Sequence, residues 1–332
     1  MKSKCDINND RQISLVLGVN GQDGSYLAES LLAKGRSVVG VGRQEVSRYV
    51  QNSELFSYRQ LDLTDIKGLA LLLDELSPHK IFHVAAIHGS FGFNYEGKWQ
   101  EAHCVNTLSL HAILEYFRCA DIVGNLIYLS SSKAFGLPLP ALISETAERQ
   151  SSCIYSITKN AATDLVRYYR NTHGISASVL WTFNHESIRR GSEYFIPKVV
   201  DCLASAIEVP EYSTEFFTLN FYADWSDAGE LMDIAISASD RRLHEDFIFA
   251  SGETVFARDL VKSLFLAFGL DYRNHVTEKT SGEFAEAHWK ADISKMSRML
   301  ERTPKIPIYD TCLKILESKY GYDCKDKLLL SD

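Results

Sequence analysis

Short apolar runs rich in β-branched residues alternate with longer amphipathic stretches from residue 13 to about residue 250. Apolar runs of about four to eight residues are typical of buried strands, and apolar positions three or four apart are typical of helices. The runs that predict strands are ISLVLG (13–18), SVVGVG (37–42), YRQLD (58–62), KIFHVAA (80–86), NLIYLSS (125–131), SASVLW (176–181), TLNFY (218–222) and DFIFAS (246–251).

Helical patterns fill the segments between these strands, including residues 24–34, which end at Gly35, and the longer stretch 99–118. Strands alternating with helices indicate a parallel sheet with helices on both faces. We therefore predict an α/β fold, a Rossmann-type doubly wound parallel sheet with a smaller C-terminal substrate-binding lobe. The alternation loosens after about residue 185, and residues 291–300 and 309–320 have the pattern of helices in that lobe.

The same pattern divides the chain into domains. We expect a disordered lead at 1–11 and an NAD(P)-binding Rossmann domain at 12–183, to which segments near 217–250 return. The substrate-binding lobe is then expected to comprise 184–216 and 251–332. No internal repeat and no low-complexity segment interrupts this organisation.

A glycine-rich turn, GVNGQDG, follows the first predicted strand and opens a helix, with glycines at 18, 21 and 24. Glycines at such a position allow a tight turn, close approach of the backbone to a pyrophosphate and close packing of the helix on the sheet. The pyrophosphate would lie at the first N–H groups of the helix. Because the turn lies within a βαβ unit, it predicts a dinucleotide site.

The end of the second strand distinguishes the two nicotinamide dinucleotides, since a carboxylate there binds the ribose 2′-hydroxyl and an arginine binds a 2′-phosphate. Arg43 stands at this position, which favours NADP, while nearby Glu45 keeps NAD possible. Asp62 follows the third strand, where it can accept from the adenine amino group or begin a helix. Ala85 and Ala86 follow the fourth strand and leave room for the cofactor.

Tyr155 and Lys159 are four residues apart at the start of a predicted helix and therefore lie on one face. A tyrosine acts as a base when its pKa falls, and a nearby ammonium favours the phenolate. Ser131, at the end of the buried run NLIYLSS, can share a substrate oxygen with the phenol. The chain thus has a glycine turn, then a strand that ends in serine, and then a helix with a tyrosine and a lysine. This order predicts a nicotinamide-dependent enzyme that oxidises or reduces a hydroxyl-bearing substrate.

Composition and charge restrict the function classes. The net charge of −8 argues against a nucleic-acid partner, although it permits a local arginine pocket for one phosphorylated molecule. No apolar stretch is long enough for a membrane helix, and the polar N-terminus has no signal-peptide pattern, so we expect a cytoplasmic protein and no membrane partner. The seven cysteines are scattered without metal-type spacing, so we expect mostly buried thiols and no metal.

The chain resembles the extended short-chain dehydrogenase/reductase family of nucleotide-sugar-modifying enzymes, and within it the GDP-mannose 4,6-dehydratases. The stretches that carry the resemblance are GVNGQDGSYLAESLLAKG, LDLTD, HVAAIHGSF, SSSKAFG, YSITKNAA, FNHESIRRG and DWSDAGELM. They cover residues 12 to about 235. GQDGSYLAE and NHESIRRG are the most specific of them.

The resemblance implies a set of site residues. The catalytic group would be Ser131, Ser132, Lys133, Tyr155 and Lys159. The cofactor would be held by Gly18, Asn20, Gly21, Gln22, Asp23 and Gly24 at its phosphates, by Arg43 at its 2′-phosphate, by Asp62 and Leu63 at its adenine, and by Ala85, Ala86, Tyr155, Lys159, His185 and Arg190. The nucleotide-sugar substrate, GDP-linked by the same resemblance, would contact His88, Ser131, Asn184 and Arg189.

One catalytic position departs from the dehydratase pattern. The dehydratases carry a glutamate there, which removes the C5 proton and helps to expel the C6 hydroxyl, whereas this chain has Lys133. A lysine in water is mostly protonated near neutral pH and must be desolvated or placed among positive charges to act as a base. Some dehydratases of other nucleotide sugars have a similar lysine, so elimination stays possible, and a purely structural Lys133 is a further alternative.

Three functions are then possible. The first is a 4,6-dehydratase, and the second is a 4-dehydrogenase, 4-reductase or epimerase that eliminates no water. Both of these include oxidation at sugar C4 to a 4-keto sugar. The third is a dinucleotide-binding module without turnover.

The segment between Arg43 and Asp62 is shorter than the dehydratase region that reaches a neighbouring subunit, which makes a tetramer doubtful. We expect a homodimer through helices 99–118 and 153–172, as in the wider family.

Overall fold

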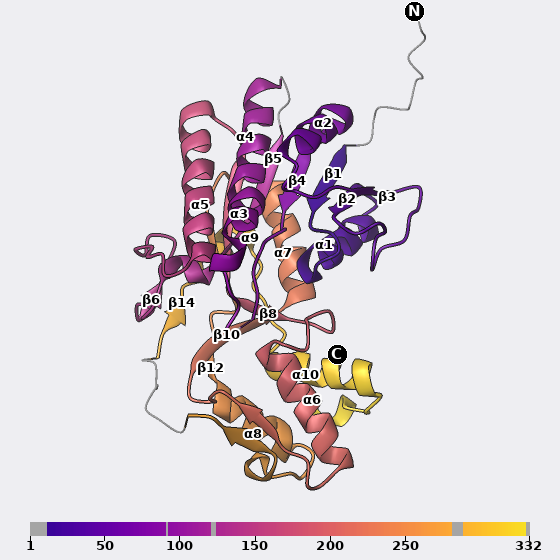
Figure 1. Cartoon of the computed structure of the whole chain (residues 1–332), viewed down its shortest axis with the longest axis vertical. Helices are drawn as coiled ribbons and strands as arrows, with labels where there is room; N and C mark the ends of the chain where they lie inside the picture. Colours follow the sequence, from indigo (N-terminus) through magenta and orange to yellow (C-terminus); the bar gives the residue numbers. More distant parts are fainter. Residues whose placement is uncertain (1–11, 91, 121–123, 281–287, 330–332) are drawn as a thin grey trace, which may run out of the picture.

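A parallel sheet forms the upper part of the molecule in the computed structural model, which describes residues 12–90, 92–120, 124–280 and 288–329 (Figure 1). The predicted lead at 1–11 lies outside the described residues. The seven strands have the spatial order β11-β7-β5-β4-β1-β2-β3. They are β1 (Ile13–Leu17), β2 (Ser37–Gly42), β3 (Phe56–Gln60), β4 (Lys80–His83), β5 (Asn125–Ser131), β7 (Ala177–Thr182) and β11 (Phe247–Phe249).

Helices cover both faces of this sheet, as predicted. One apolar cluster joins the sheet to α2 (Ile66–Leu76), α4 (Ser109–Cys119) and α5 (Ile154–His173). A second cluster joins the opposite face to α1 (Gln22–Ala33), α7 (Ala228–Arg241) and α9 (Ser294–Leu300). The central strands β1, β5 and β7 are buried on both faces, which explains why they are continuous apolar runs in the sequence.

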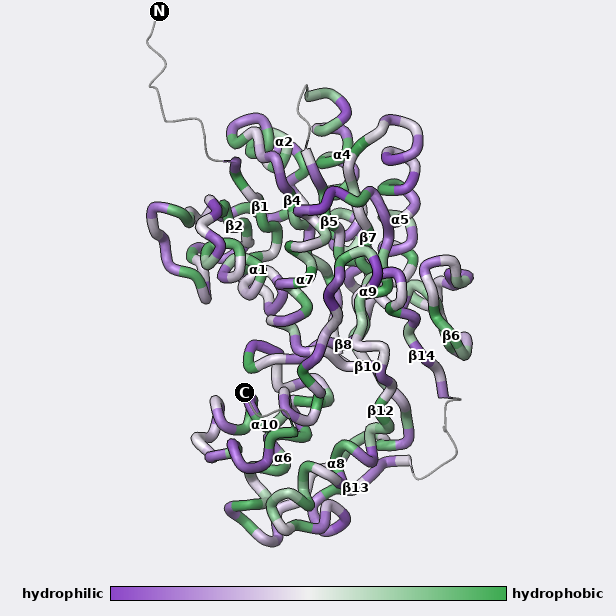
Figure 2. The backbone as a smooth tube through the Cα atoms, turned by 180° about the vertical axis from the view of Figure 1, so that it is seen from behind, coloured by the Kyte–Doolittle hydropathy of each residue, from purple (hydrophilic) through white to green (hydrophobic). Residues whose placement is uncertain are grey.

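A smaller lobe lies below the sheet, with its own apolar cluster. It contains α6 (Phe195–Glu208), α8 (Ala257–Leu266), α10 (Ile308–Tyr320), and the parallel pair β9 (Thr214–Phe216) and β13 (Val276–Glu278). Figure 2 shows hydrophobic segments in both parts, which are connected through the narrower region near β8 (Asn184–Glu186) and β10 (Tyr222–Asp227). β12 (Thr254–Phe256) pairs with the outer edge of β10.

The remaining elements are short. β6 (Leu142–Ile143) pairs with β14 (Lys290–Ala291) beside the sheet. The predicted helix 99–118 is α3 (Trp99–His103), a π-helical turn η2 (Cys104–Leu108) and α4 in succession. Turns of 3₁₀ helix occur at η1 (Glu96–Lys98), η3 (Ser132–Phe135), η4 (Tyr272–Asn274) and η5 (Lys325–Lys327).

Two predictions about the C-terminal half were wrong in position. The predicted strand 218–222 is a turn up to residue 221, because the Thr218 hydroxyl accepts from the N–H of Asn220 and the Glu278 carboxylate accepts from the N–H of Leu219. Helix α9, which we assigned to the lobe, packs against the sheet, where Met296 and Leu300 enter the sheet cluster. Helix α10 contributes to the apolar cluster of the lobe.

Candidate active site

A cleft of about 1360 Å³ lies where the carboxyl ends of the parallel strands face the lobe. Ligands of open α/β sheets bind at this edge. The glycine turn, the ends of β2, β4 and β5, and the first turn of α5 line the side of the sheet, while β8, α6 and residues 216–221 line the side of the lobe.

The glycine turn has the geometry that a phosphate site requires. Gly18 has φ +96°, and a Cβ there would lie 2.9 Å from the Cα of Ala85. A Cβ on Gly24 would overlap the carbonyl oxygen of Gly18. Gly21 is the N-cap of α1, so the N-terminal N–H groups of this helix face the cleft. The backbone is therefore packed as closely as glycine permits, and the N-terminus of α1 faces the cleft, where an anion can bind.

Arg43 is exposed at the end of β2 and lines the cleft. Its loop is held by the side chain of Asn20, whose amide nitrogen donates to the Val46 carbonyl (2.9 Å) and whose oxygen accepts from the Arg48 N–H (2.8 Å). Asn20, which we predicted as a cofactor ligand, thus anchors the loop that carries Arg43. Glu45 is exposed in the same loop.

Asp62 lines the other edge of this end of the cleft, with Leu63, Ala85 and Ala86. One of its carboxylate oxygens accepts from the N–H (2.9 Å) and the hydroxyl (2.8 Å) of Thr64. These hydrogen bonds lower the pKa of Asp62. The residue that caps α2 is Asp65, so Asp62 is not the helix N-cap and keeps its second oxygen for a ligand.

Tyr155, Lys159 and Ser131 all line the cleft. Tyr155 and Lys159 lie on the buried face of α5, and the Lys159 Nζ is 5.8 Å from the Tyr155 ring centre. That Nζ donates to the carbonyl of Leu129 (2.6 Å), which lies two residues before Ser131 on β5. Burial lowers the pKa of Lys159 to about 7.

The expected fall in the pKa of Tyr155 is not found in the protein without ligand. Burial raises the pKa of Tyr155, and its hydrogen bond with Ser131 only partly opposes this. The Asp23 carboxylate raises it further. Lys159, whose own pKa burial lowers to about 7, is only partly charged and does not offset the burial of the phenol.

A buried group of charges lies between the glycine turn and β8. The His185 ring contacts the Asp23 carboxylate through Nε2 (2.8 Å) and the Phe183 carbonyl through Nδ1 (2.7 Å). Both partners are acceptors, so the ring carries both protons. Burial opposes this charge, but Asp23 raises the pKa of His185 above its ordinary value. Burial would raise the pKa of Asp23, yet His185 and Arg190 hold it well below its usual range.

Arg190 extends this group, while Arg189 does not. Arg190 lines the cleft, donates to the His185 carbonyl (2.9 Å) and pairs with Glu186 (3.3 Å). Glu186, which we did not predict, is buried, and burial raises its pKa. Arg189, predicted to contact substrate, is not among the cleft-lining residues. It turns away toward α1, where its guanidinium lies between two tyrosine rings.

Aromatic rings surround the phenol of Tyr155. The His88 ring lies 5.9 Å from the Tyr155 ring and 5.8 Å from that of Tyr194, measured between centres. Tyr95 stacks on Tyr155 at 5.7 Å, and the Lys133 Nζ lies 5.6 Å from the Tyr95 ring. Tyr95 and Tyr194 were missed from the sequence because their segments have no strand or glycine signal.

The comparisons with known proteins agree with this geometry. The model of the GDP-mannose 4,6 dehydratase family matches residues 15–308. The chain belongs to this family. It is 31% identical over 321 residues to GDP-mannose 4,6 dehydratase 1 of Arabidopsis thaliana, covering 91% of this chain and 88% of the relative. The fold is therefore that of the extended short-chain dehydrogenase/reductase enzymes.

Solved structures show the same fold at lower identity. A UDP-glucose 4-epimerase of Thermotoga maritima, solved with UDP-glucose, has a TM-score of 0.79 at 17% identity, covering 93% of this chain and 99% of the epimerase. RMD of Pseudomonas aeruginosa, complexed with NADPH, has a TM-score of 0.75 at 17% identity, covering 94% and 100%.

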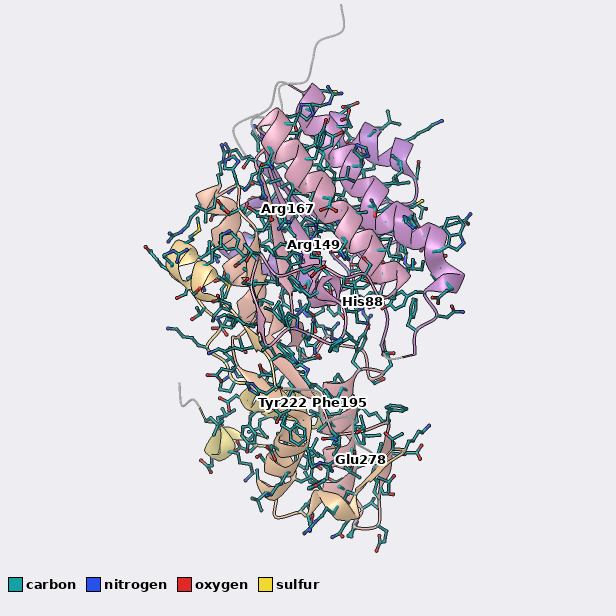
Figure 3. All side chains as sticks on the ribbon, turned by 90° about the vertical axis from the view of Figure 1, so that its left-hand side faces the viewer. His88, Arg149, Arg167, Phe195, Tyr222 and Glu278 are labelled. Carbon is teal, nitrogen blue, oxygen red and sulfur yellow. The ribbon has the colours of Figure 1, made fainter. Side chains whose placement is uncertain are left out.

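In this member of the GDP-mannose dehydratase family, the lobe contributes an apolar and polar wall, most of which has no signal in the sequence. Asn184, a predicted substrate ligand, lines the cleft at the start of β8. The other lining residues are Glu193, Phe195, Lys198, Phe216, Phe217, Thr218, Asn220, Phe221 and Trp225. Figure 3 labels Phe195 and Tyr222 near the boundary of the two parts and Glu278 deeper in the lobe. Glu278 pairs with Arg258 (2.7 Å) and holds the Leu219 N–H (2.6 Å), which fixes this wall.

A second cavity of about 360 Å³ adjoins the cleft at Ser132 and Lys133. Tyr95, Leu139, Cys153 and Trp289 are among its lining residues. The part of the chain that the structure describes has no cluster of three or more His, Cys, Asp or Glu side chains suited to a metal ion. Within the same residues, each helix is too short or too polar to cross a bilayer.

Proposed function

We propose that this chain is an NADP-dependent enzyme that modifies a nucleotide-diphosphate sugar, GDP-linked, by oxidation at C4 in the manner of a GDP-mannose 4,6-dehydratase. The observation that carries the proposal is that Ser131, Tyr155 and Lys159 share one cleft with the glycine turn. These are the groups that alcohol oxidation by a nicotinamide requires: an anion site for the cofactor, and a phenol with a hydroxyl and an amine beside it.

The residues present fit a dinucleotide. A Cβ at Gly18 or Gly24 would fill the space at the N-terminus of α1, so this turn supports the pyrophosphate site. Arg43, exposed at the end of β2, would hold a 2′-phosphate, and Asp62 would accept from the adenine. When bound, the oxidised nicotinamide supplies a hydride acceptor that later becomes the donor, together with a positive charge.

The chain's own residues handle the protons. The Tyr155 phenol takes the proton of the C4 hydroxyl once its pKa is lowered, and Ser131 donates to the same oxygen. Lys159 is held on the Leu129 carbonyl, near enough to stabilise a phenolate when it is charged. Residues 216–221 and Trp225 line the cleft on the side of the lobe.

Loss of water after the oxidation needs a group other than the family's glutamate, because Lys133 stands at that position. An alternative is therefore a 4-dehydrogenase, 4-reductase or epimerase, which needs only the hydride step. The observation that favours this alternative is that Lys133 is exposed and contacts the Tyr95 ring, without a carboxylate beside it in the residues described.

The test is to add GDP-mannose to the purified protein with NADP, recording the absorbance of reduced nicotinamide and the mass of the product. A 4-keto-6-deoxy product, lighter by one water, identifies the dehydratase, and lasting nicotinamide reduction identifies the dehydrogenase. Tyr155→Phe should abolish turnover while NADP still binds, whereas Tyr168→Phe, an exposed tyrosine on the same helix, should not. Absence of any change with all nucleotide sugars tested would indicate a binding module.

We also propose that the protein forms a homodimer through α3, η2, α4 and α5. Large apolar side chains on these helices are exposed: Trp99, Leu108, Ile157 and Tyr168. Leu108→Glu should yield a monomer by size-exclusion chromatography with light scattering, and Leu71→Glu, on exposed α2, should leave the dimer intact. A wild-type monomer, or a tetramer unaffected by Leu108→Glu, would contradict this assignment.

A further inference from the structure

Replacement of the family's glutamate by Lys133 leaves open which group removes the proton next to the new ketone. The inference drawn here rests on the proposed function, namely oxidation at C4. His88 follows β4 and lines the cleft, and Figure 3 places it near the boundary of the sheet and the lobe. Its ring contacts both Tyr155 and Tyr194, so it lies beside the phenol that would take the proton of the C4 hydroxyl.

The imidazole of His88 is available as a base. Within the part of the chain that the structure describes, neither of its ring nitrogens has a hydrogen-bond partner. Desolvation in the cleft and the positive charge of Arg190 lower the pKa of His88 to about 4. The other charged groups that act on it are Asp23, which opposes the shift, and Lys159 and His185, which add to it. A neutral imidazole presents one unprotonated nitrogen.

The two least exposed carboxylates of the cleft are already engaged. Asp23 is paired with His185, and Glu186 with Arg190. Lys133 contacts Tyr95, whose ring stacks on that of Tyr155, and its side chain is exposed. An ammonium is a donor with three N–H groups and no acceptor. The cleft therefore presents an unpaired acceptor at His88 and a donor at Lys133.

We propose that His88 and Lys133 divide the two tasks of the family's glutamate: His88 removes the C5 proton and Lys133 protonates the departing C6 hydroxyl. The C5–H bond breaks and its proton passes to the imidazole nitrogen. Its electron pair forms the C5–C6 double bond as the C6–O bond breaks, and the oxygen leaves as water with a proton from Lys133. No external oxidant or reductant is consumed in this step.

The experiment incubates the NADP-loaded enzyme with GDP-mannose in deuterium oxide and compares His88→Gln, Lys133→Gln and wild type. Deuterium at C5 is read by NMR, loss of water by mass, and C4 oxidation by nicotinamide absorbance. His88→Gln should retain C4 oxidation while C5 exchange falls roughly 100-fold or more, the contribution typical of a general base. Lys133→Gln should still exchange at C5 but lose no water. His173→Gln, an exposed histidine at the end of α5, is the matched control.

Several results would overturn the division of tasks. C5 exchange in His88→Gln at the wild-type rate, or loss of exchange in Lys133→Gln, would assign the base elsewhere. A His88→Gln variant that only weakens GDP-mannose binding, measured by calorimetry without turnover, would make His88 a binding residue. Circular dichroism shows whether each variant is folded. Failure of the proposed function looks different, since neither wild type nor Lys133→Gln would then reduce the nicotinamide.

Discussion

Arg189 joins three segments that surround the cofactor end of the cleft, and its removal makes a measurable prediction. Its guanidinium carbon lies 4.1 Å from the Tyr26 ring centre on α1 and 4.6 Å from that of Tyr49, in the loop that follows Arg43. It also donates to the Ser25 hydroxyl (2.8 Å) and pairs with Glu29 (2.6 Å). The side chain is 14% exposed, so these contacts are only partly screened by water.

The magnitude follows from these contacts. Each cation–π contact contributes about 0.5–1 kcal/mol at a partly exposed position. The charged hydrogen bond to Ser25 contributes about 1.5 kcal/mol, and the pair with Glu29, a 40% exposed carboxylate, adds at most about 0.5 kcal/mol. Arg189→Met should therefore lower the free energy of unfolding by about 3 kcal/mol. For 332 residues this corresponds to a fall of about 4 °C in Tm.

Calorimetric unfolding and NADP titration are the assays. Because Tyr49 is in the loop of Arg43, Arg189→Met should also raise the Kd for NADP. The Kd rises about tenfold if roughly 1.4 kcal/mol of the binding free energy depends on the contacts of Arg189. Arg167→Met is the control, since Arg167 also stacks on a ring, that of Trp181 (5.1 Å), and pairs with Asp246 far from the cleft. It should lower Tm and leave the Kd unchanged. Equal Kd values for NADP in both variants would refute a role of the Arg189 contacts in ordering the loop that carries Arg43.

Three further predictions test the cofactor end of the cleft. Gly24→Ala should destabilise the protein by about 1–3 kcal/mol through overpacking and should weaken NADP binding. The control is Gly35→Ala, where φ is +70° and the space is open, which should cost about 1 kcal/mol and leave the Kd for NADP unchanged. Comparable Kd values for the two variants would show that the turn tolerates a Cβ. Arg43→Gln should reduce the preference for NADP over NAD roughly 10- to 100-fold, and an unchanged ratio of Kd values would remove Arg43 from the 2′-phosphate site. Asp23 raises the pKa of His185 above its unfolded value of 6.5, so the stability from this pair is present below about pH 6.5 and is lost as pH rises through the raised pKa. Denaturation curves at several pH values should show this loss in the wild type and not in Asp23→Asn. Parallel pH profiles of the two proteins would contradict the pairing.

The sequence was sufficient where local pattern determines structure. The central strands are buried on both faces, so their apolar runs were visible, and the strand at 125–131 has the predicted bounds. The glycine turn needs no distant partner to define it. Tyr155 and Lys159 share a face because helix geometry fixes residues four apart. These features bring the predicted residues to one cleft.

The sequence was insufficient where distant side chains determine orientation. Arg189 and Arg190 are adjacent and identical in type, yet Tyr26 and Tyr49 draw one toward α1, while Glu186 keeps the other in the cleft. Nothing in the local pattern distinguishes them. Residues 218–221 resemble a strand in composition, but Glu278 accepts from the Leu219 N–H and fixes a turn. Long-range polar contacts of this kind leave no periodic signal.

The protonation of Lys159 connects the structure to cofactor binding. Burial lowers its pKa to about 7, so the free protein holds a partly neutral amine where a phenolate would need an ammonium. An anionic diphosphate in the cleft raises the pKa of a nearby amine, so NADP binding should take up a proton near pH 7–8. Titration calorimetry in buffers of different ionisation enthalpy measures this uptake, which Lys159→Met should remove while NADP still binds. Undiminished uptake in that variant would assign the proton to another group, and the buried amine would then not be the residue whose charge is set by the cofactor.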